Sequence, residues 1–272
     1  MIDGELVPVP PDVELLALAL HVAREGAAGL LAALHLTREA VAEKSSPTDM
    51  VTEMDRATER RVVEGILAVR PHDGIVGEEG STQVGTTGVT WCLDPLDGTT
   101  NYLYRIPAFA VSLAAIVDGE TAAAVVLDPA RGEEFTALRG VGSWLDGTPL
   151  AVSAQTELAR ALVGTGFSYD SSRRRRQAAV LGEVLPAVRD IRRVGAAALD
   201  LCWVACGRLD AFYEKGLAPW DHAAGELVAR EAGARTSDLD GGPLSSSFAL
   251  ASTPAIHDEL RALLDHAGAR SA

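Results

Sequence analysis

The chain has 272 residues, of which 47% are hydrophobic and 23% are charged, and its formal net charge is −14 at pH 7. This composition is typical of a globular protein with one large core or two modest ones, and it argues against disorder. The negative charge argues against nucleic acid and acidic membranes as partners, because both attract positively charged proteins.

The cysteines and histidines give no sign of a disulfide framework or a zinc site. Cys92, Cys202 and Cys206 include no CxxC pair, which fits a reducing cytoplasm, and the six histidines form no HxxxH or HExxH pattern. We expect small core positions for Cys202 and Cys206 and structural roles for the histidines. The acidic N-terminus is unlike a signal peptide, and no uninterrupted apolar run approaches ~18 residues, so no membrane span is expected.

Two helices are predicted at the start of the chain. Apolar residues recur at helical spacing over residues 11–44, which predicts one long or broken helix with Gly26 and Gly29 as weak points. A capping box at Thr52 predicts the start of a second helix over residues 52–70, and the proline that follows stops it.

A largely antiparallel sheet is predicted after these helices, and the second half of the chain has a different pattern of predicted elements. Before residue 152 we predict a strand at 74–77, a polar connection at 80–88 and a hairpin of strands at 109–116 and 121–127. Beyond it, strands alternate with helices, which indicates α/β layers. These strands are predicted at 161–164, 191–193, 211–214 and 248–251, and the helices at 172–188, 196–206, 221–232 and 254–266. A soft boundary at 152–157 predicts two domains, 1–152 and 153–272.

The strongest functional signal is the segment WCLDPLDGTTN at 91–101. An apolar run predicts the end of a buried strand that delivers Asp94 and Asp97, and the residues from Gly98 to Thr100 can then open a helix. Divalent cations such as Mg²⁺ bind carboxylate and carbonyl oxygens, whereas a phosphate binds the free N–H groups at a helix N-terminus. The segment therefore predicts a metal site beside an anion site.

Three further carboxylates are candidates for the same site. Glu78 follows the predicted strand at 74–77, and strand ends are where α/β scaffolds expose functional groups. Asp221 stands directly before a predicted helix, where an N-cap role is the simpler interpretation. Asp55 has the same ambiguity, since it could be the acidic partner of the capping box. Each alone favours a turn or a cap, but together they favour a functional site.

Two other patterns are weaker. The run of four arginines at 173–176 could contact phosphate or RNA, but in an acidic protein it is more typical of a solvated helix start. A dinucleotide fingerprint fails because Leu145 stands where the third glycine after Gly140 and Gly142 is needed, and no GxxxxGK[ST] motif exists.

The motifs GEEG at 77–80, DPLDGTTN at 94–101 and WDHAAG at 220–225 resemble those of the inositol monophosphatase family in order and spacing. The segments 49–55 and 231–234 match as well, so the resemblance covers about residues 13–264. It implies a layered αβαβα sandwich of the α+β or α/β class, usually assembled as a homodimer.

The resemblance also implies the metal ligands. Glu78, Asp94 and the carbonyl of Leu96 would hold a first Mg²⁺, and Asp94, Asp97 and Asp221 a second. A third, weaker Mg²⁺ would sit near Glu78, mainly through water, which gives two to three ions per subunit. Bound Mg²⁺ reverses the local charge, so an acidic protein can take an anionic substrate.

The remaining site residues follow from the same resemblance. Asp55, Glu78 and Thr99 are the expected catalytic residues, with Asp55 and Thr99 polarising the attacking water. The expected substrate-binding residues are Gly98, Thr99, Thr100, Ala197, Glu214 and Asp221, of which Ala197 and Glu214 would line the alcohol pocket. The variable loops at 81–88 and 166–176 are expected to decide specificity.

The activity that the resemblance implies is Mg²⁺-dependent hydrolysis of a small polyol or sugar monophosphate by direct attack of metal-activated water. Inositol 1-phosphate is the first candidate substrate, and fructose 1,6-bisphosphate, histidinol phosphate and 3′-phosphoadenosine 5′-phosphate are alternatives. From another class, a regulatory or RNA-associated binding protein could keep the fold, although the complete ligand set argues against lost activity. We expect a cytoplasmic homodimer whose partner is a small phosphorylated substrate.

Overall fold

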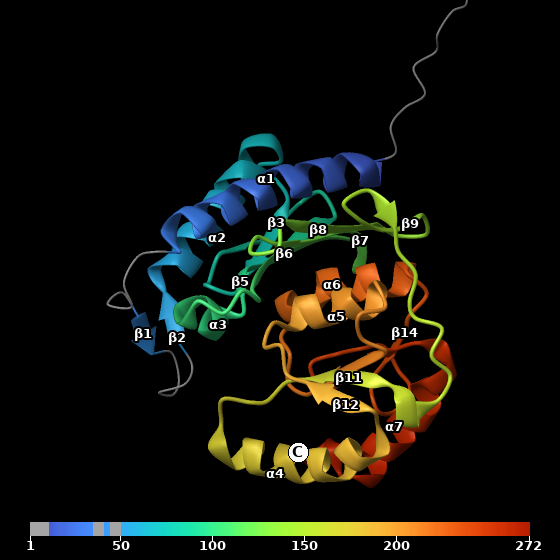
Figure 1. The fold of residues 1–272 in the computed structure, drawn as a ribbon. Helices are drawn as coiled ribbons and strands as arrows, with labels where there is room; N and C mark the ends of the chain where they lie inside the picture. The colour runs from blue at the N-terminus through green and yellow to red at the C-terminus, as the bar shows by residue number, and fades with distance from the viewer. Residues whose placement is uncertain (1–10, 35–40, 44–49) are drawn as a thin grey trace, which may run out of the picture.

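The computed structural model describes residues 11–34, 41–43 and 50–272, and its helices and sheets form five alternating layers (Figure 1). From one side to the other, these layers are a helix pair, a large sheet, a second helix pair, a small sheet and a third helix pair. The three pairs are α1 (Pro11–Ala33) with α2 (Glu53–Val69), α5 (Ala197–Ala205) with α6 (Pro219–Glu231), and α4 (Ser171–Val184) with α7 (His257–His266). The predicted αβαβα sandwich is confirmed.

The large sheet has eight strands in the described part of the chain, and its neighbours are antiparallel except for the parallel pair β3 and β5. In spatial order it holds β10 (Thr148–Pro149), β9 (Gly142–Leu145), β8 (Glu133–Leu138), β7 (Glu120–Asp128), β6 (Ala110–Val117), β5 (Val89–Asp97), β3 (Gly74–Gly77) and β4 (Thr82–Gln83). The predicted hairpin corresponds to β6 and β7, and the strand predicted at 74–77 is β3.

The small sheet is mixed. In spatial order it holds β12 (Asp190–Arg192), β11 (Leu162–Thr165), β13 (Ala211–Glu214), β15 (Ala249–Ser252) and β14 (Arg235–Ser237). β11 is parallel to both neighbours, and the other pairs are antiparallel. The sequence did not predict β14, because a three-residue Arg-Thr-Ser strand has no apolar alternation to reveal it.

Shorter elements complete the described chain. β1 (Val41–Glu43) pairs with β2 (Met50–Thr52), and α3 (Thr99–Tyr104) follows β5. Single 3₁₀ turns occur at Leu158–Arg160, Leu185–Ala187, Pro254–Ile256 and Ala269–Ser271.

The first helix differs from its prediction in length and continuity. It ends at Ala33, and residues 41–43, which the prediction included, form a strand; residues 35–40 and 44–49 lie outside the described residues. Gly26 is not a break. A Cβ there would lie 3.1 Å from side-chain atoms of both Thr58 and Val62 of α2, so this glycine lets the two helices approach closely.

The second helix begins at Glu53, as predicted within one residue, and ends at Val69. Thr52 belongs to β2, and its side chain lies outside what the structure describes, so the capping box remains a prediction.

Apolar side chains fill the space between the layers, and both faces of the large sheet are covered. Leu15, Val22 and Leu30 of α1 pack on one face against Trp91 of β5. On the other face, side chains of α5 and α6 such as Leu227 pack against β6, β7 and β8. The central strands are therefore buried on both sides, which explains their nearly continuous apolar sequence.

The helix at Asp12–Ala33 is long and apolar enough to cross a membrane by length and composition. It is the one such helix in the searched part of the chain, and its apolar face is the one that packs on the large sheet and α2. The packing role predicted for it is confirmed.

The structural roles expected for Cys202 and the histidine at 257 are confirmed, and the arginine run starts a helix as expected, although Arg173 and Arg174 are half-buried and not fully solvated. Cys202 is fully buried, and burial raises the pKa of its thiol well above the usual value. His257 is fully buried between the hydroxyls of Ser237 and Ser252, at 2.9 and 2.8 Å. The arginine run lies in the first turns of α4, whose N-cap Asp170 accepts a hydrogen bond from a backbone N–H of the run.

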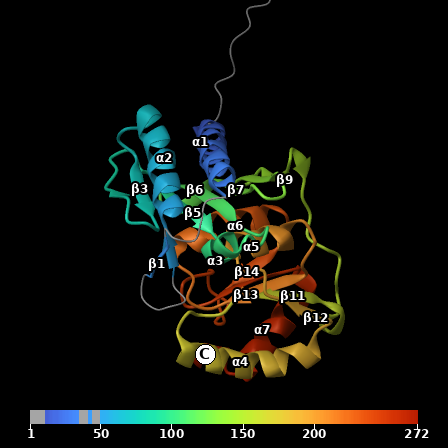
Figure 2. The ribbon, with the colours of Figure 1, turned by 60° about the vertical axis from the view of Figure 1, so that its left-hand side comes forward.

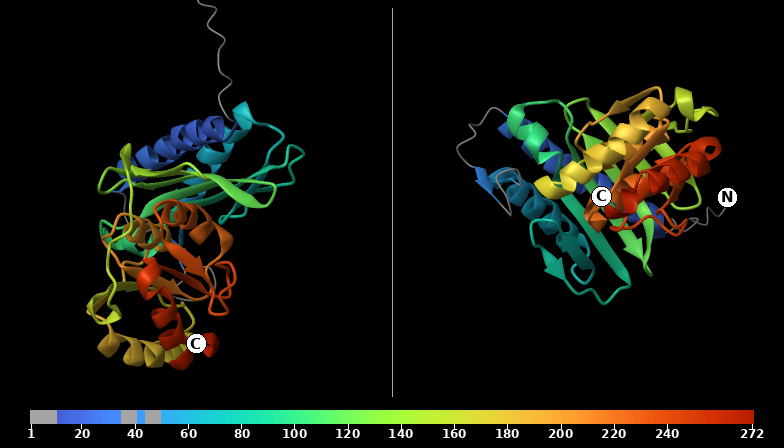
Figure 3. Two further views of the ribbon diagram at one scale, coloured as in Figure 1. Left: turned by 90° about the vertical axis from the view of Figure 1, so that its right-hand side faces the viewer. Right: turned by 90° about the horizontal axis from the view of Figure 1, so that it is seen from below.

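The two sheets come from consecutive parts of the chain. The predicted division at 152/153 falls between β10, the last strand of the large sheet, and β11, the first of the small one. However, α5 and α6 come from the later part and cover the sheet formed by the earlier part, as Figure 2 and Figure 3 show. The division into two domains remains a prediction.

Candidate active site

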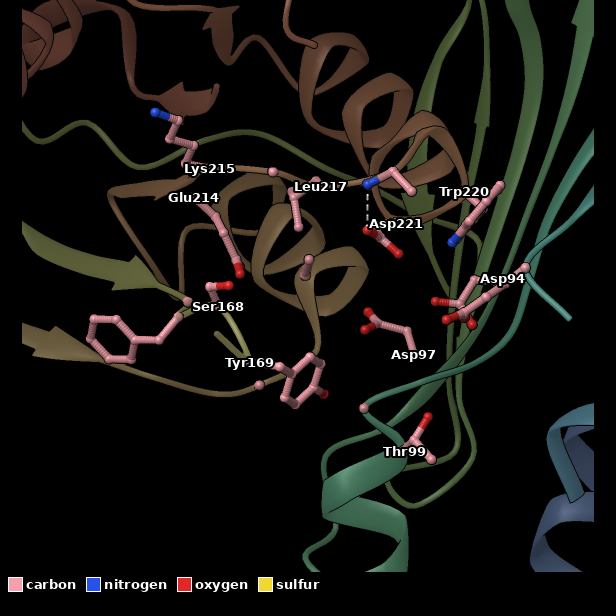
Figure 4. A pocket seen from close by; sticks show the side chains of 18 of the residues that line it. Asp94, Asp97, Thr99, Ser168, Tyr169, Glu214, Lys215, Leu217, Trp220 and Asp221 are labelled. Atoms are coloured by element: carbon pink, nitrogen blue, oxygen red, sulfur yellow. Dashed lines mark hydrogen bonds between the residues drawn. The ribbon is translucent and has the colours of Figure 1, made fainter. Parts of the chain in front are cut away.

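A cavity of about 450 Å³ lies where the two parts of the chain meet (Figure 4). Its lining comes from Glu78 and from the segments 94–99, 166–173, 193–197 and 214–221. Each of these segments follows or ends a strand of one of the two sheets, so loops and strand ends from both sheets form the walls.

Four carboxylates gather at one end of this cavity. Glu78, Asp94 and Asp221 each place a carboxylate oxygen within 4.8 Å of the others, and Asp97 lines the cavity beside them. Asp94 is 2% exposed. Burial raises the pKa of Asp94 and Asp97 well above their usual range, and the negative charge of neighbouring carboxylates raises it further. The cluster therefore suits a bound cation.

Asp94 and Asp97 are fixed by backbone hydrogen bonds at the end of β5. The Leu96 N–H donates to Asp94 Oδ1 at 2.9 Å, and the Ala198 N–H donates to Asp97 Oδ2 at 2.7 Å. The sequence placed both aspartates at or just after the end of a strand, which holds for Asp97, the last residue of β5, whereas Asp94 lies inside β5. Pro95 has no N–H for the ladder, and the register to β6 shifts between the two aspartates.

Asp221 reaches the cluster from α6. It is the third residue of the helix, whose N-cap is Ala218, so the N-cap interpretation of Asp221 is wrong. Pro219 accounts for the earlier start, because proline is favoured at the first helical position. The Asp221 carboxylate accepts a hydrogen bond from the Ala218 N–H at 2.6 Å, drawn as a dashed line in Figure 4, and its other oxygen faces the cavity.

Glu78 lies in a turn that a buried carboxylate holds in place. Glu59 of α2 is 3% exposed and accepts hydrogen bonds from the N–H groups of Glu79 at 2.8 Å and Ser81 at 2.9 Å. A Cβ on Gly77 would lie 2.4 Å from Glu59 Oε2, so glycine is needed there. Sequence reasoning missed Glu59, although a charged residue on the buried face of a helix was a usable signal.

Gly98 and Thr99 join the cluster to α3. Gly98 has φ 90°, a left-handed conformation that favours glycine, and a Cβ there would lie 2.9 Å from the Ala108 carbonyl oxygen. The Thr99 hydroxyl donates to the Leu96 carbonyl at 3.1 Å. Leu96, Gly98 and Thr99 all line the cavity, and their roles in holding metal and phosphate remain predictions.

Two expected site residues do not line the cavity. Thr100 lies within α3, and Asp55 is buried in α2. Burial and the nearby Asp55 carboxylate raise the pKa of Tyr102 to about 12. The roles of Asp55 in activating water and of Thr100 in binding substrate therefore remain predictions.

The other end of the cavity is formed by the later part of the chain. Glu214 and Ala197 line it, together with Ser168 and Tyr169 from the loop after β11. Burial raises the pKa of Glu214 to about 7, although nearby Arg193 opposes the shift. Sequence reasoning missed Arg193 and Lys215, which line this end, because single basic residues between elements carry no pattern.

The fold and the buried acidic cavity suit an enzyme that binds a cation, and comparison with known proteins shows the family. The sequence pattern of the inositol monophosphatase family matches residues 12–269, so the chain belongs to that family. Its members are phosphoric monoester hydrolases, and the expected family and enzyme class are confirmed.

Individual proteins similar to this chain agree with the family assignment. The inositol-1-monophosphatase SuhB of Mycobacterium tuberculosis is 47% identical over 237 residues, which are 83% of this chain and 81% of that protein. The Nus factor SuhB of Escherichia coli K12 is 43% identical over 231 residues, 84% of this chain and 86% of that one. The crystal structure of the extragenic suppressor protein suhB from Bartonella henselae superposes with a TM-score of 0.88 at 33% identity, covering 92% of this chain and 98% of that chain.

Proposed function

We propose that this protein is a Mg²⁺-dependent phosphomonoesterase that acts on a small polyol or sugar phosphate, with inositol 1-phosphate as the first candidate. The observation that carries the proposal is the cluster of Glu78, Asp94 and Asp221, which opens into a cavity large enough for such a molecule. The name of the mycobacterial relative, an inositol-1-monophosphatase, supports inositol 1-phosphate as the first candidate substrate.

The residues present fit Mg²⁺. Glu78, Asp94 and Asp221 each offer a carboxylate oxygen, which is the kind of ligand that Mg²⁺ prefers. Glu78, Asp94 and Asp221 would hold it, with Asp97 and the Leu96 carbonyl beside them. Bound Mg²⁺ would neutralise charge on the phosphate and lower the pKa of an attacking water.

The chain itself binds and orients the phosphate in this proposal. Gly98 and Thr99 stand at the first turn of α3, where backbone N–H groups have no partner within the helix and can donate to phosphate oxygens. The Thr99 hydroxyl donates a hydrogen bond to the Leu96 carbonyl oxygen, so the lone pairs of the hydroxyl oxygen remain free to accept a hydrogen bond from a water and orient it. Water then attacks phosphorus directly, and no phosphoenzyme forms.

Phosphate release from a panel of monophosphates, with Mg²⁺ and with EDTA, tests the proposal. Inositol 1-phosphate, histidinol phosphate, 3′-phosphoadenosine 5′-phosphate and glycerol 2-phosphate form the panel. We expect Mg²⁺-dependent release that is fastest for the polyol phosphates. Release from none of them, by a protein with normal circular dichroism, would contradict the proposal.

A second role is compatible with this activity. The Escherichia coli relative carries the name Nus factor, so we also propose a regulatory, transcription-associated contact as a second candidate function. Such a contact would use the outer surface and not the acidic cluster. Co-precipitation of transcription proteins by a catalytically inactive variant would support it, and loss of all binding in that variant would count against a separate surface.

We further propose that the protein is a cytoplasmic homodimer. Three free cysteines are compatible with a reducing compartment. Tyr104 and Ile106, at the end of α3, are 55% and 49% exposed, which is unusual for large apolar side chains that lie so close together. Light scattering of the purified protein should give twice the mass of one chain.

A further inference from the structure

Two walls of the cavity come from different parts of the chain and meet at one joint. The first wall is the end of β5 with the residues that follow it, 97–99, and the second contains Glu214 and the segment 193–197 that leads into α5. In Figure 4, Glu214 lies across the cavity from Asp97 and Thr99. In the proposed function, the first wall takes the phosphate and the second takes the alcohol, so one substrate has to fit the distance between them.

The side chain of Asn101 ties the two walls together at this joint. Asn101 lies on α3, is 5% exposed and does not line the cavity. Its Nδ2 lies 2.7 Å from the carbonyl oxygen of Ala108 and 2.9 Å from that of Val194, with the carbonyl oxygen of Gly195 at 3.5 Å. Because carbonyl oxygens only accept, the amide N–H groups are the donors, and they reach both the earlier and the later part of the chain.

Two glycines let the backbones approach closely around this amide. A Cβ on Gly195 would lie 3.2 Å from Asn101 Nδ2, and Gly195 has φ 89°, where other residues are strained. A Cβ on Gly98 would lie 3.3 Å from both the Ala196 Cβ and the Gly195 carbonyl oxygen. The two walls therefore touch where the Asn101 amide donates its hydrogen bonds, and a change at this amide acts directly on their separation.

A second hydrogen bond crosses the same joint, from the Ala198 N–H to the carboxylate of Asp97. Asp97 is an expected metal ligand, so its carboxylate has to serve the cation as well. The Asn101 amide is neutral, and its hydrogen bonds depend neither on a bound cation nor on pH. Asn101 is also the single asparagine of the chain. The proposed function does not use this side chain, although it belongs to the segment with the strongest functional signal in the sequence.

We propose that Asn101 is a positioning residue that sets the distance between the wall that takes the phosphate and the wall that takes the alcohol. This inference rests on the proposed function and extends it to a residue outside the cavity. A ligand that touches one wall, such as inorganic phosphate, binds independently of Asn101. A phosphate ester that touches both walls depends on it, because small errors in the placement of two binding groups are costly only when one molecule has to reach both.

The variant Asn101→Leu tests the inference, because leucine has a similar size and donates no side-chain hydrogen bond. The KM for inositol 1-phosphate should rise about tenfold, as expected for the loss of buried hydrogen bonds. The inhibition constant of inorganic phosphate should change less than about twofold. Steady-state kinetics with phosphate as a competitive inhibitor measures both quantities. Asn101→Ser, whose hydroxyl can keep one hydrogen bond, should show a smaller rise in KM, and it provides the measurement if Asn101→Leu does not fold.

Thr253→Val is the matched control. Thr253 is fully buried, its hydroxyl donates to the Gln155 carbonyl oxygen at 3.1 Å across 98 residues of sequence, and it does not line the cavity. The control therefore loses a long-range hydrogen bond of the same kind away from the joint. The Tm should fall in both variants, whereas the KM for inositol 1-phosphate should stay within about twofold of the wild-type value in the control.

An unchanged KM in Asn101→Leu, or equal rises in KM and in the phosphate inhibition constant, would overturn the inference. So would the same rise in KM in Thr253→Val. A wild-type protein that releases phosphate from no substrate overturns the proposed function instead. Calorimetric titration of the Mg²⁺-loaded protein with inositol 1-phosphate then tests the joint alone. Weaker binding in Asn101→Leu than in Thr253→Val would keep the positioning role, and equal binding would overturn it.

Discussion

At the scale of single residues, Asp94 is the side chain on which the acidic cluster depends. It is 2% exposed, it lies within 4.8 Å of two other carboxylates, and it accepts a hydrogen bond from the Leu96 N–H. A carboxylate in such surroundings is costly to ionise without a cation. These surroundings support the proposal that Asp94 binds a cation.

Asp94→Asn should therefore abolish phosphate release while leaving the fold intact. We expect at least about a thousandfold loss of kcat, because the amide cannot supply the negative charge that a divalent ion needs. Steady-state kinetics at saturating Mg²⁺ measures this, with Glu64→Gln, an exposed acid on α2, as the control. Activity near that of the wild type would show that the cluster is not the metal site.

Glu214 should make the metal-free protein less stable as the pH rises. Its folded pKa of about 7 lies above the ordinary value of 4.5, so the folded state keeps a proton that the unfolded state has released. By linkage, this group's contribution to the free energy of unfolding falls between pH 4.5 and about 7. Urea denaturation of Glu214→Gln in EDTA should show a gain over the wild type that grows from pH 5 to pH 8. A difference in the free energy of unfolding between variant and wild type that stays constant with pH would contradict the raised pKa of Glu214.

Residues of contiguous motifs were the ones that the sequence could predict. Asp94, Asp97 and Gly98 lie in one segment whose residue types alone indicate a metal site beside an anion site. All three line the cavity. Arg193 offered no sequence signal, and Glu59 offered only that of a charged residue on a buried helix face, because its hydrogen-bond partners are backbone groups remote in the sequence. The hydrogen bonds of Glu59 span 20 and 22 residues, for example.

At the scale of elements, the turn between β3 and β4 is held by α2. Glu59 accepts hydrogen bonds from two N–H groups of this turn, and it does so across the space left by Gly77. The turn carries Glu78, so the position of one cluster carboxylate depends on a side chain that does not reach the cavity. Glu59 is thus a positioning residue.

Glu59→Gln should weaken Mg²⁺ binding without abolishing activity. The amide keeps the size of the side chain but can accept only one of the two strong hydrogen bonds, and loss of such outer partners typically lowers metal affinity 10- to 100-fold. Mg²⁺ titration calorimetry should show this loss, and saturating Mg²⁺ should restore kcat. Glu64→Gln serves as the control again. A lowered kcat with unchanged Mg²⁺ affinity would refute the positioning role.

Element types were predicted more successfully than element ends. α1 shows the reason, because its apolar periodicity continues beyond the point where the helix stops, and Gly26 weakens an isolated helix but allows its packing on α2. β14 shows the opposite case, in which pairing with β15 makes a strand out of polar residues. In both, tertiary contacts decided the outcome.

At the scale of the whole molecule, the acidic cluster connects the large sheet to the helix layer that separates the two sheets. Asp94 and Asp97 belong to the large sheet, Asp221 belongs to a helix between the sheets, and Asp97 accepts a hydrogen bond from the start of α5. A cation bound to these residues would join segments more than 120 residues apart in sequence, as Asp94 and Asp221 are. The layer order itself came from the family resemblance, since strand and helix patterns do not fix it.

Mg²⁺ should therefore stabilise the whole fold. A ligand at 100 times its Kd adds about 2.7 kcal/mol to the free energy of unfolding, which corresponds to roughly 5 °C in Tm for a chain of this size. Thermal unfolding with Mg²⁺ and with EDTA should show this increase in the wild type and none in Asp94→Asn. An equal increase in both would mean that the ion binds elsewhere.

The position of α5 and α6 also has a consequence for how the protein is made. Ribosomes complete the large sheet before residues 197–231 exist, yet those residues cover one of its apolar faces. At roughly 5 to 20 residues per second, the nascent sheet waits several seconds with that face open. During synthesis, this protein therefore passes through a stage in which chaperones have an apolar surface to bind, and that stage ends when α6 docks.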